Sequence, residues 1–264
     1  MMREFSPAKV NLFFRVLSKR PDGYHEVASL YTVVNFGDFL IIKEASKDSF
    51  LSNVTWLLND SSNLIIKARD AFRKETNIKT PISIRLEKNI PIMAGLGGGS
   101  SNAATVLWMM NNYFGRPLSI DQLIKIGAAL GSDVPFFFSN GCAYCTGRGE
   151  VLKNIDRADS FWIAKHSRYL LSTPDVYASC IPCELSVDDS LFVNDLEPAA
   201  FRLLPSLMSF KQDLLNLGFS RVVMTGSGSA FICKGDVKKP RLPSTTFNFV
   251  TTIQRDQLKW YGET

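Results

Sequence analysis

The chain has 264 residues, 45% of them hydrophobic and 21% charged, a balance that is ordinary for a globular protein and excludes a disordered or fibrous one. Its formal net charge of +5 suits an anionic small-molecule partner, but no basic cluster is dense enough to indicate a nucleic acid. No apolar run approaches the roughly 20 residues that cross a bilayer, and the charged, proline-containing start is unlike a signal peptide. We therefore expect a cytoplasmic protein with no membrane partner.

The N-terminal region predicts strands. Residues 9–18 alternate and are rich in Val, Leu and Phe, which is typical of a strand. Residues 20–23 (Arg-Pro-Asp-Gly) predict a turn, because proline presets φ and glycine accepts positive φ. Residues 26–34 and 39–43 predict two further strands.

The next part of the chain mixes helices and strands. A helix is predicted over residues 63–76, with Ser61 or Ser62 as its N-cap and one apolar face directed inward. Residues 81–86 alternate and predict a strand. A glycine-rich segment follows, and then a helix that runs to about residue 114.

Ser119 is the expected N-cap of the following helix, and Gly131 is expected to end that helix by adopting the left-handed conformation. Beyond residue 155 the signals weaken. The elements expected there are strands at 161–164, 221–225 and 230–234, a short helix opened by Pro174, and an amphipathic helix at 206–217 stopped by Gly218.

Two Cys-x-x-Cys pairs, at 142/145 and 180/183, superficially resemble a zinc site. Cys142 and Cys145 fall in a predicted strand, where positions three apart point to opposite faces, so their sulfur atoms should diverge. We favour buried free thiols, with zinc as the alternative. An odd count of five cysteines also argues against a disulfide framework.

The most informative segment is Gly95–Ser101, with the sequence GLGGGSS. Its four glycines let the backbone bend closely around a ligand, and the helix that follows offers unpaired N–H groups and a positive dipole end to a phosphate. It is not a P-loop, because no Lys-Ser or Lys-Thr follows the last glycine, and a Rossmann fingerprint would need glycine where Ser100 stands. The protein-kinase motifs His-Arg-Asp and Asp-Phe-Gly are missing. A flexible surface loop is the alternative, which the flanking strand and helix disfavour.

Residues 91–104 resemble the second signature of the GHMP kinases, whose loop wraps the ATP triphosphate. Two further segments match that superfamily in the same order, Pro-Ala-Lys-Val-Asn-Leu at 7–12 and Gly-Ser-Gly-Ser-Ala-Phe at 226–231. The resemblance implies an α+β fold (an α/β sandwich) with two lobes. The N-terminal domain, residues 1–155, would be like the second domain of ribosomal protein S5, and the C-terminal domain, residues 156–264, would be ferredoxin-like.

Within the superfamily, the triple glycine followed by Ser-Ser-Asn-Ala-Ala is similar to the diphosphocytidyl-methylerythritol kinases. The segments at 20–25, 131–137, 147–150 and 194–197 resemble the same branch. This resemblance implies ATP-dependent phosphorylation of the 2-hydroxyl of a small-molecule cytidyl diphosphate substrate, in the non-mevalonate route to isoprenoid precursors, by a monomer or weak homodimer. The alternatives are another GHMP kinase, of homoserine or mevalonate type, and a non-catalytic nucleotide- or RNA-binding protein.

The resemblance places catalysis at Lys9 and Asp133. A carboxylate can accept the proton of a hydroxyl nucleophile, and an ammonium beside it keeps it ionised and stabilises charge that develops during transfer. Lys9 lies between Ala8 and Val10 in an otherwise apolar strand, so an acidic neighbour is expected. The alternatives are a turn-capping role for Asp133 and an exposed edge position for Lys9.

The resemblance also implies the binding residues. Those expected to contact ATP are Pro91, Ile92, Met93, Ala94, Gly95, Leu96, Gly97, Gly98, Gly99, Ser100, Ser101, Asn63, Leu64 and Lys88. Those expected to contact the substrate are Asn11, Tyr24, His25, Thr173, Pro174 and Tyr177, with Tyr24, His25 and Tyr177 on the cytosine ring.

Simpler roles stay open for some of these residues. A capping asparagine explains Asn63, a solvated lysine explains Lys88, a solvated turn histidine explains His25, and a partly buried helix aromatic explains Tyr177 nearly as well. Transfer from ATP implies Mg²⁺. The helix before Asp133 contains Asp121 but no Glu, so the metal ligands stay unassigned.

Overall fold

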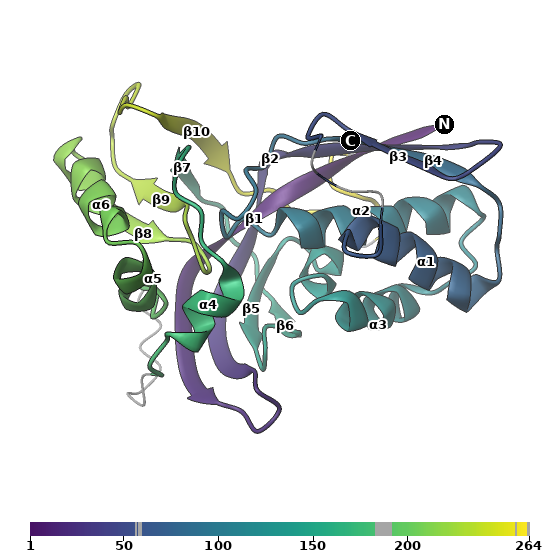
Figure 1. Ribbon diagram of the computed structural model, residues 1–264, viewed down its shortest axis with the longest axis horizontal. Coiled ribbons are helices and arrows are strands. Elements are labelled where there is room, and N and C mark those ends of the chain that lie inside the picture. Colours follow the sequence, from purple (N-terminus) through teal and green to yellow (C-terminus); the bar gives the residue numbers. More distant parts are fainter. Residues whose placement is uncertain (56, 58–59, 183–191, 257, 263–264) are drawn as a thin grey trace.

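The structure, a computed structural model, describes residues 1–55, 57, 60–182, 192–256 and 258–262 (Figure 1). Its strands form two sheets. The first sheet contains β1 (Met2–Lys19), β2 (His25–Glu44), β3 (Ser49–Ser52), β4 (Ile82–Glu87), β5 (Cys142–Thr146) and β6 (Val151–Asn154). The second sheet contains β7 (Ser160–His166), β8 (Arg221–Met224), β9 (Phe231–Lys234) and β10 (Thr245–Thr251).

Strand β2 organises the first sheet. One edge of it pairs with β1, and the other pairs with β4 near its end and with β5 nearer its start, all antiparallel. The prediction of two strands in this stretch was wrong, because β2 is continuous. Gly37 lets it pass close to β1, since a Cβ atom there would lie only 2.4 Å from the carbonyl oxygen of Ser6.

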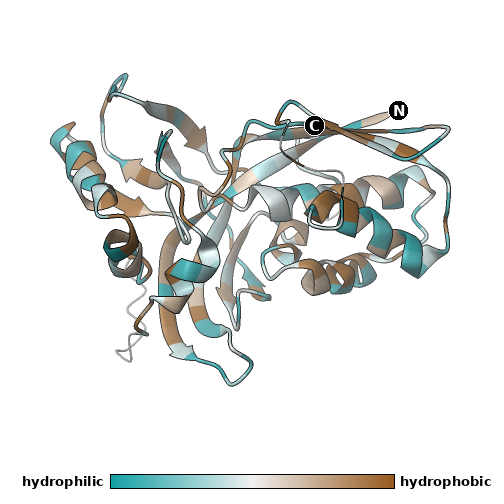
Figure 2. Ribbon diagram, viewed as in Figure 1, coloured by the Kyte–Doolittle hydropathy of each residue, from teal (hydrophilic) through white to brown (hydrophobic). Residues whose placement is uncertain are grey.

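Helices α1 (Leu64–Thr76), α2 (Gly98–Tyr113) and α3 (Ile120–Leu130) pack together beside the first sheet (Figure 1). Helix α2 is the central one, and its residues 101–111 are buried on every side. Figure 2 shows both teal and brown segments on α1, as expected for a helix with one face in water and the other on the core. The long buried helix carries the glycine-rich segment at its N-terminus.

Of the helix ends predicted at Ser61 or Ser62, Ser119 and Gly131, two were wrong and one was confirmed. Ser119 caps α3 in a full capping box with Gln122. The cap of α1 is Asn63, whose side chain accepts the N–H of Ile65, rather than either serine before it. Gly131 ends α3 in extended backbone, with φ of 179°, so no left-handed cap is present.

Strand β1 lies between two apolar clusters, because its side chains enter both of them. Ala8, Val10 and Leu12 point into an apolar layer that also includes Ile163 and Ile232 of the second sheet. Because successive side chains of a strand point to opposite faces, the residues between them leave on the other side. The two long strands thus pack one face against the second sheet, and residues of the other face, such as Phe14, Tyr31 and Val33, belong to the apolar cluster that includes helices α1 and α2.

The second sheet has the strand order β10-β7-β9-β8 and is antiparallel throughout. Helices α4 (Thr173–Ala178), α5 (Glu197–Leu203) and α6 (Ser206–Asn216) lie between β7 and β8 in the chain. The ferredoxin-like β-α-β-β-α-β order is thereby met except at its second helix, because residues 235–244 join β9 to β10 without one. Strand β10 and helix α5 were not predicted.

After β10 the chain returns to the first sheet. The ring of Trp260 stacks on Trp108 of α2 at a centroid distance of 5.2 Å, and its Nε1 donates to the carbonyl oxygen of Phe5 at 2.9 Å. The guanidinium of Arg255 donates to the carbonyl oxygens of Phe138 and Ser139. We propose that a division near residue 155 separates the two lobes, with this returning segment belonging to the first lobe.

Trp260→Ala is expected to lower the free energy of unfolding by about 3–5 kcal/mol, because it empties a fully buried site. Urea unfolding followed by tryptophan fluorescence and circular dichroism measures the change. Leu258→Ala, two residues earlier and 72% exposed, is the control that should leave the midpoint unchanged. An unchanged midpoint in Trp260→Ala would show that the returning segment does not stabilise the fold.

Cys142 and Cys145 point in the directions that the geometry of a strand predicts. Cys142 and Cys145 are free and buried, and their side chains lie in two different apolar clusters, on opposite faces of β5. Cys183 lies outside the described residues. Over the described part of the chain no group of three His, Cys, Asp or Glu side chains could hold a metal ion, and no helix is long and apolar enough to cross a membrane.

Candidate active site

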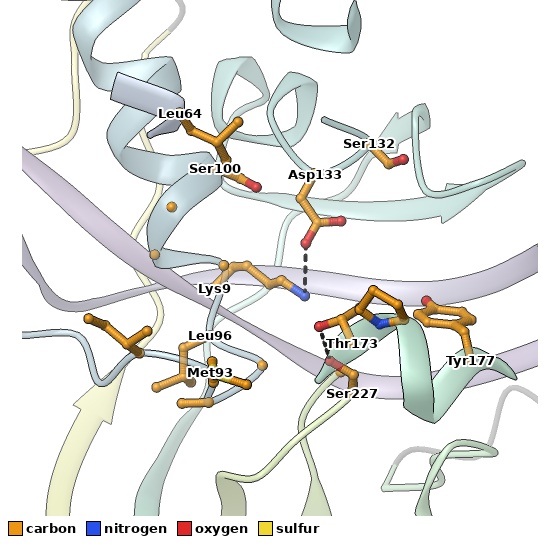
Figure 3. Close-up of a pocket in the computed structure, with 18 of the residues that line it drawn as sticks. Lys9, Leu64, Met93, Leu96, Ser100, Ser132, Asp133, Thr173, Tyr177 and Ser227 are labelled. Carbon is orange, nitrogen blue, oxygen red and sulfur yellow. Dashed lines mark hydrogen bonds and ion pairs between the residues drawn. The ribbon is translucent and has the colours of Figure 1, made fainter. Parts of the chain in front are cut away.

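A cleft of about 930 Å³ runs between the glycine-rich segment, the ends of β1 and β2, and helix α4. In the view of Figure 3, Met93, Leu96 and Ser100 lie on one side of it and Thr173, Tyr177 and Ser227 on the other. Lys9 and Asp133 stand between the two groups. All the predicted site residues line this cleft except Asn11 and Ser101.

The glycine-rich segment leads directly into α2, and its last residues form the first turn of that helix. The N-cap is Gly97, which has no side chain with which to cap the helix, and the first turn contains no acidic residue. The initial N–H groups and the positive end of the helix dipole therefore lie at the cleft, where they can bind an anion.

Two glycines of this segment are required by close packing as well as by φ. Gly95 has φ of 75°, and a Cβ atom there would lie 2.0 Å from the carbonyl oxygen of Thr225. Gly97 has φ of 67°, and a Cβ atom there would lie 2.7 Å from Cγ of Lys9. The segment is thus held between β1 and the loop that begins at residue 225, with little freedom to move.

The acidic neighbour expected for Lys9 is Asp133. The Nζ atom of Lys9 lies 3.4 Å from Oδ2 of Asp133, and their side chains are 4% and 28% exposed. Lys9 also donates to Oδ1 of Asn11 at 2.9 Å. A buried ammonium is therefore held between a carboxylate and an amide oxygen, at the centre of the cleft, with the carboxylate partly open to a ligand.

Tyr31 of β2 completes this centre and was not predicted from the sequence. Its hydroxyl donates to Oδ1 of Asp133 at 3.3 Å, and the Nζ of Lys9 lies 4.5 Å from its ring centroid. Burial, and then the charge of Asp133, raise the pKa of Tyr31 well above its usual value. The phenol therefore stays protonated and acts as a donor to one carboxylate oxygen, while the other faces Lys9.

Asn11 and Ser101 lie behind the cleft rather than in its wall. The side chain of Asn11 is buried, where its amide donates to Oγ of Ser29 and its side-chain oxygen accepts from Lys9. Ser101 is also buried, and its hydroxyl bonds to that of Ser6 on the side of α2 that faces β1. Neither side chain is exposed to the cleft, and their predicted contact with a ligand stays a prediction.

Lys88 lines the cleft, but the charge of its ammonium is balanced by a buried carboxylate of the protein. Its Nζ lies 2.5 Å from Oδ2 of Asp38, which is fully buried, and 3.3 Å from the side-chain oxygen of Asn102. The other oxygen of Asp38 accepts the backbone N–H groups of Asn89 and Ile90, both at 2.7 Å. Burial lowers the pKa of Lys88 from its usual value. This network fixes the chain just before the glycine-rich segment.

Aromatic side chains gather at the opposite end of the cleft. The rings of His25 and Tyr177 lie 5.3 Å apart, and Tyr24 is 52% exposed at the end of the first hairpin. The guanidinium of Arg148, another residue that was not predicted, lies 4.8 Å from the centroid of the Tyr24 ring. Burial, and then the charge of Lys19, lower the pKa of His25, so its imidazole is neutral near pH 7.

Helix α4 is tied to the loop at residues 226–229. The hydroxyls of Thr173 and Ser227 lie 2.8 Å apart, and this bond closes one wall of the cleft (Figure 3). Both Gly226 and Ser227 line the cleft. The sequence offered a signal for this loop in its Gly-Ser-Gly-Ser motif and for Arg148 in the segment 147–150, whereas no local pattern distinguished Tyr31 from other strand residues.

Comparison with known proteins gives concordant results. The model of the GHMP kinases N terminal domain matches residues 63–141. A 4-diphosphocytidyl-2-C-methyl-D-erythritol kinase from Protochlamydia amoebophila is 41% identical over 99% of this chain and 93% of its own. A crystal structure of 4-(cytidine 5'-diphospho)-2C-methyl-D-erythritol kinase is 29% identical with a TM-score of 0.81, covering 96% of this chain and 99% of that one. A mevalonate kinase structure, 14% identical with a TM-score of 0.66 over 97% of this chain and 100% of that one, shares the fold.

Proposed function

The chain belongs to the 4-diphosphocytidyl-2-C-methyl-D-erythritol kinases of the GHMP superfamily, and on this premise we propose how its cleft transfers the γ-phosphoryl group of ATP to the 2-hydroxyl of that cytidyl substrate. The observation that carries the proposal is the contact of Lys9 with Asp133 between an anion-binding helix start and an aromatic end. The product would be the 2-phosphate, together with ADP, on the methylerythritol phosphate route to isoprenoid precursors.

ATP is assigned to the side of the cleft formed by the glycine-rich segment. The first N–H groups of α2 would bind the triphosphate, and Asn63 and Leu64 would line the adenine pocket. Lys88 would act mainly through the buried network that holds this segment in place.

Mg²⁺ fits the residues that face this side. It commonly takes most of its ligands from water and substrate phosphates, and Ser100 and Asp133 offer a hydroxyl and a carboxylate at the cleft. When bound with ATP, Mg²⁺ would neutralise charge on the phosphate oxygens.

The cytidyl substrate is assigned to the aromatic end. Tyr24 and Tyr177 offer ring faces for stacking on the cytosine, and the neutral His25 offers a hydrogen bond to its polar edge. Thr173 and Pro174 would line the same part of the wall. This arrangement directs the methylerythritol portion of the substrate toward Lys9 and Asp133.

The transfer itself needs one proton acceptor and one cation. The 2-hydroxyl oxygen attacks the γ-phosphorus, the bond from that phosphorus to the bridging oxygen breaks, and ADP leaves with the electron pair. Asp133 accepts the hydroxyl proton, and Lys9 stabilises the charge on the attacking and transferred oxygens. Tyr31 orients the carboxylate by donating to its other oxygen. A cytoplasmic monomer or weak homodimer is part of the same proposal.

Release of ADP, measured by a coupled assay, tests which alcohol accepts the phosphoryl group. We expect turnover with the cytidyl diphosphate substrate and none with homoserine or mevalonate. The double variant Tyr24→Ala, His25→Ala is expected to raise the KM for the cytidyl substrate by about 10- to 100-fold, since base stacking contributes about 1–3 kcal/mol.

Phe249→Ala, an aromatic that is 56% exposed on β10 and outside the cleft, is the matched control and should keep the wild-type KM. Turnover of homoserine or mevalonate in place of the cytidyl compound would assign the chain to another acceptor.

A further inference from the structure

The segment Asn194–Glu197 (Asn-Asp-Leu-Glu) has no place in the mechanism above, although its sequence is distinctive. It runs along β1: the N–H of Phe14 donates to the carbonyl oxygen of Val193, and the N–H of Asp195 donates to that of Phe14, both at 2.8 Å. An isolated parallel bridge joins Phe14 to Asn194. The segment is therefore a strap that lies between the strand carrying Lys9 and the end of β8.

The side chain of Asn194 is buried, and each of its polar groups is used. Its amide donates to the carbonyl oxygens of Met224 at 2.7 Å and Gly226 at 2.8 Å. Its own oxygen accepts the N–H of Leu196 at 2.9 Å. Only a carboxamide supplies two donors and one acceptor in this shape, since a carboxylate cannot donate.

The two carbonyls that Asn194 binds flank Thr225, which is where this loop meets the catalytic centre. The hydroxyl of Thr225 accepts the N–H of Asn11 at 3.0 Å and donates to its side-chain oxygen at 3.3 Å. That same oxygen accepts from Lys9. Because Gly226 and Ser227 continue into the wall of the cleft, a shift of this loop would move both the wall and the ammonium.

We propose that Asn194 is a positioning residue for phosphoryl transfer. Its side chain fixes the position of the 224–227 loop relative to β1 and, through Thr225 and Asn11, the position of the Lys9 ammonium. The inference rests on the proposed function, because it assigns Lys9 its role. It requires no contact between Asn194 and either substrate.

The neighbouring residue provides a matched control on the same strap. Asp195 accepts the N–H of Val16 at 2.9 Å and pairs with Arg15 at 3.3 Å, so its side chain holds the strap to β1. None of its described side-chain contacts reaches the 224–227 loop. Asp195→Asn therefore weakens the strap without removing the two donors that Asn194 directs to the loop.

The test compares Asn194→Asp with Asp195→Asn in the full chain, at a temperature where circular dichroism shows both folded. Asn194→Asp places a carboxylate against two carbonyl oxygens, and we expect kcat to fall by about 100-fold, the cost of a displacement near 1 Å at the reacting groups. The affinity for a non-hydrolysable ATP analogue, measured by calorimetry, should stay close to that of wild type. Asp195→Asn should lower the urea midpoint yet keep a kcat near that of wild type.

A wild-type kcat in Asn194→Asp would overturn the inference, as would equal losses of kcat in the two variants. If Asn194→Asp does not fold, Asn194→Ser retains one uncharged donor, and its kcat is expected to lie below that of wild type while analogue binding is kept. A wild-type chain that does not turn over the cytidyl substrate would instead defeat the proposed function, and the comparison of the variants would proceed with the alcohol that the chain does phosphorylate.

Discussion

Asp133→Asn is expected to lower kcat by about 10²- to 10⁴-fold, the usual contribution of a general base. The substitution keeps the size of the side chain and an oxygen that can accept from the Tyr31 hydroxyl. It removes the basic oxygen that faces Lys9 and the cleft. The loss should therefore fall on kcat, measured by ADP release at saturating concentrations of both substrates, with little change in the urea midpoint.

Asp121→Asn provides the control for Asp133→Asn, since it makes the same change on the exposed face of α3, outside the cleft. Its kcat should equal that of wild type. Full activity in Asp133→Asn would remove Asp133 as the proton acceptor. Binding of ATP without any turnover in wild type would favour a non-catalytic nucleotide-binding protein.

Lys9→Met is expected to lower kcat by about 10²- to 10³-fold, the range seen when one donor to a developing oxyanion is lost. Methionine fills much of the same volume and retains the methylene groups that pack beside Gly97. The ammonium that lies against Asp133 and Asn11 is lost. Lys43→Met, an exposed position on β2, should leave kcat unchanged.

The double variant of Lys9 and Asp133 adds a sharper measurement. Because both side chains act on the same transfer, their losses should not multiply, and the double variant should be nearly as active as the poorer single variant. Losses that multiply would show that the two residues act independently, which the 3.4 Å contact between them argues against.

The features that the sequence predicted well are those that local chemistry determines. The α3 N-cap needs only Ser119 and Gln122, which are three residues apart. The composition of the glycine-rich segment by itself indicates an unusual backbone conformation. The burial of Lys9 among apolar strand residues implied an acidic neighbour before any fold was known. Motif resemblance then identified that neighbour as Asp133.

The features that the sequence could not predict depend on contacts between distant parts of the chain. Lys88 precedes the glycine-rich segment, which suggested a phosphate contact, but its partner Asp38 comes from β2, fifty residues earlier. The family resemblance implied that Asn11 contacts the substrate, and the structure adds that its side chain is bonded to Ser29 and Thr225 behind the cleft. Sequence spacing carries no information on either pairing.

The continuous β2 illustrates a second limit. Asn35, Phe36, Gly37 and Asp38 lack the alternation of a strand, and glycine is a common sign of a break. Gly37 is instead required where β2 passes over Ser6, and Asp38 is buried to hold Lys88. A glycine that the sequence pattern marks as a break in a strand can thus be the residue that lets two strands approach each other.

The return of the last residues to the first sheet has a consequence for synthesis of the chain. Trp260 and Arg255 complete the packing around Trp108, but both follow the second sheet in the chain and are therefore synthesised after it. A nascent chain that has emerged as far as residue 155 carries the strands and helices of the first lobe with an indole face still uncovered. The first lobe therefore reaches its final packing only after the second sheet has been synthesised.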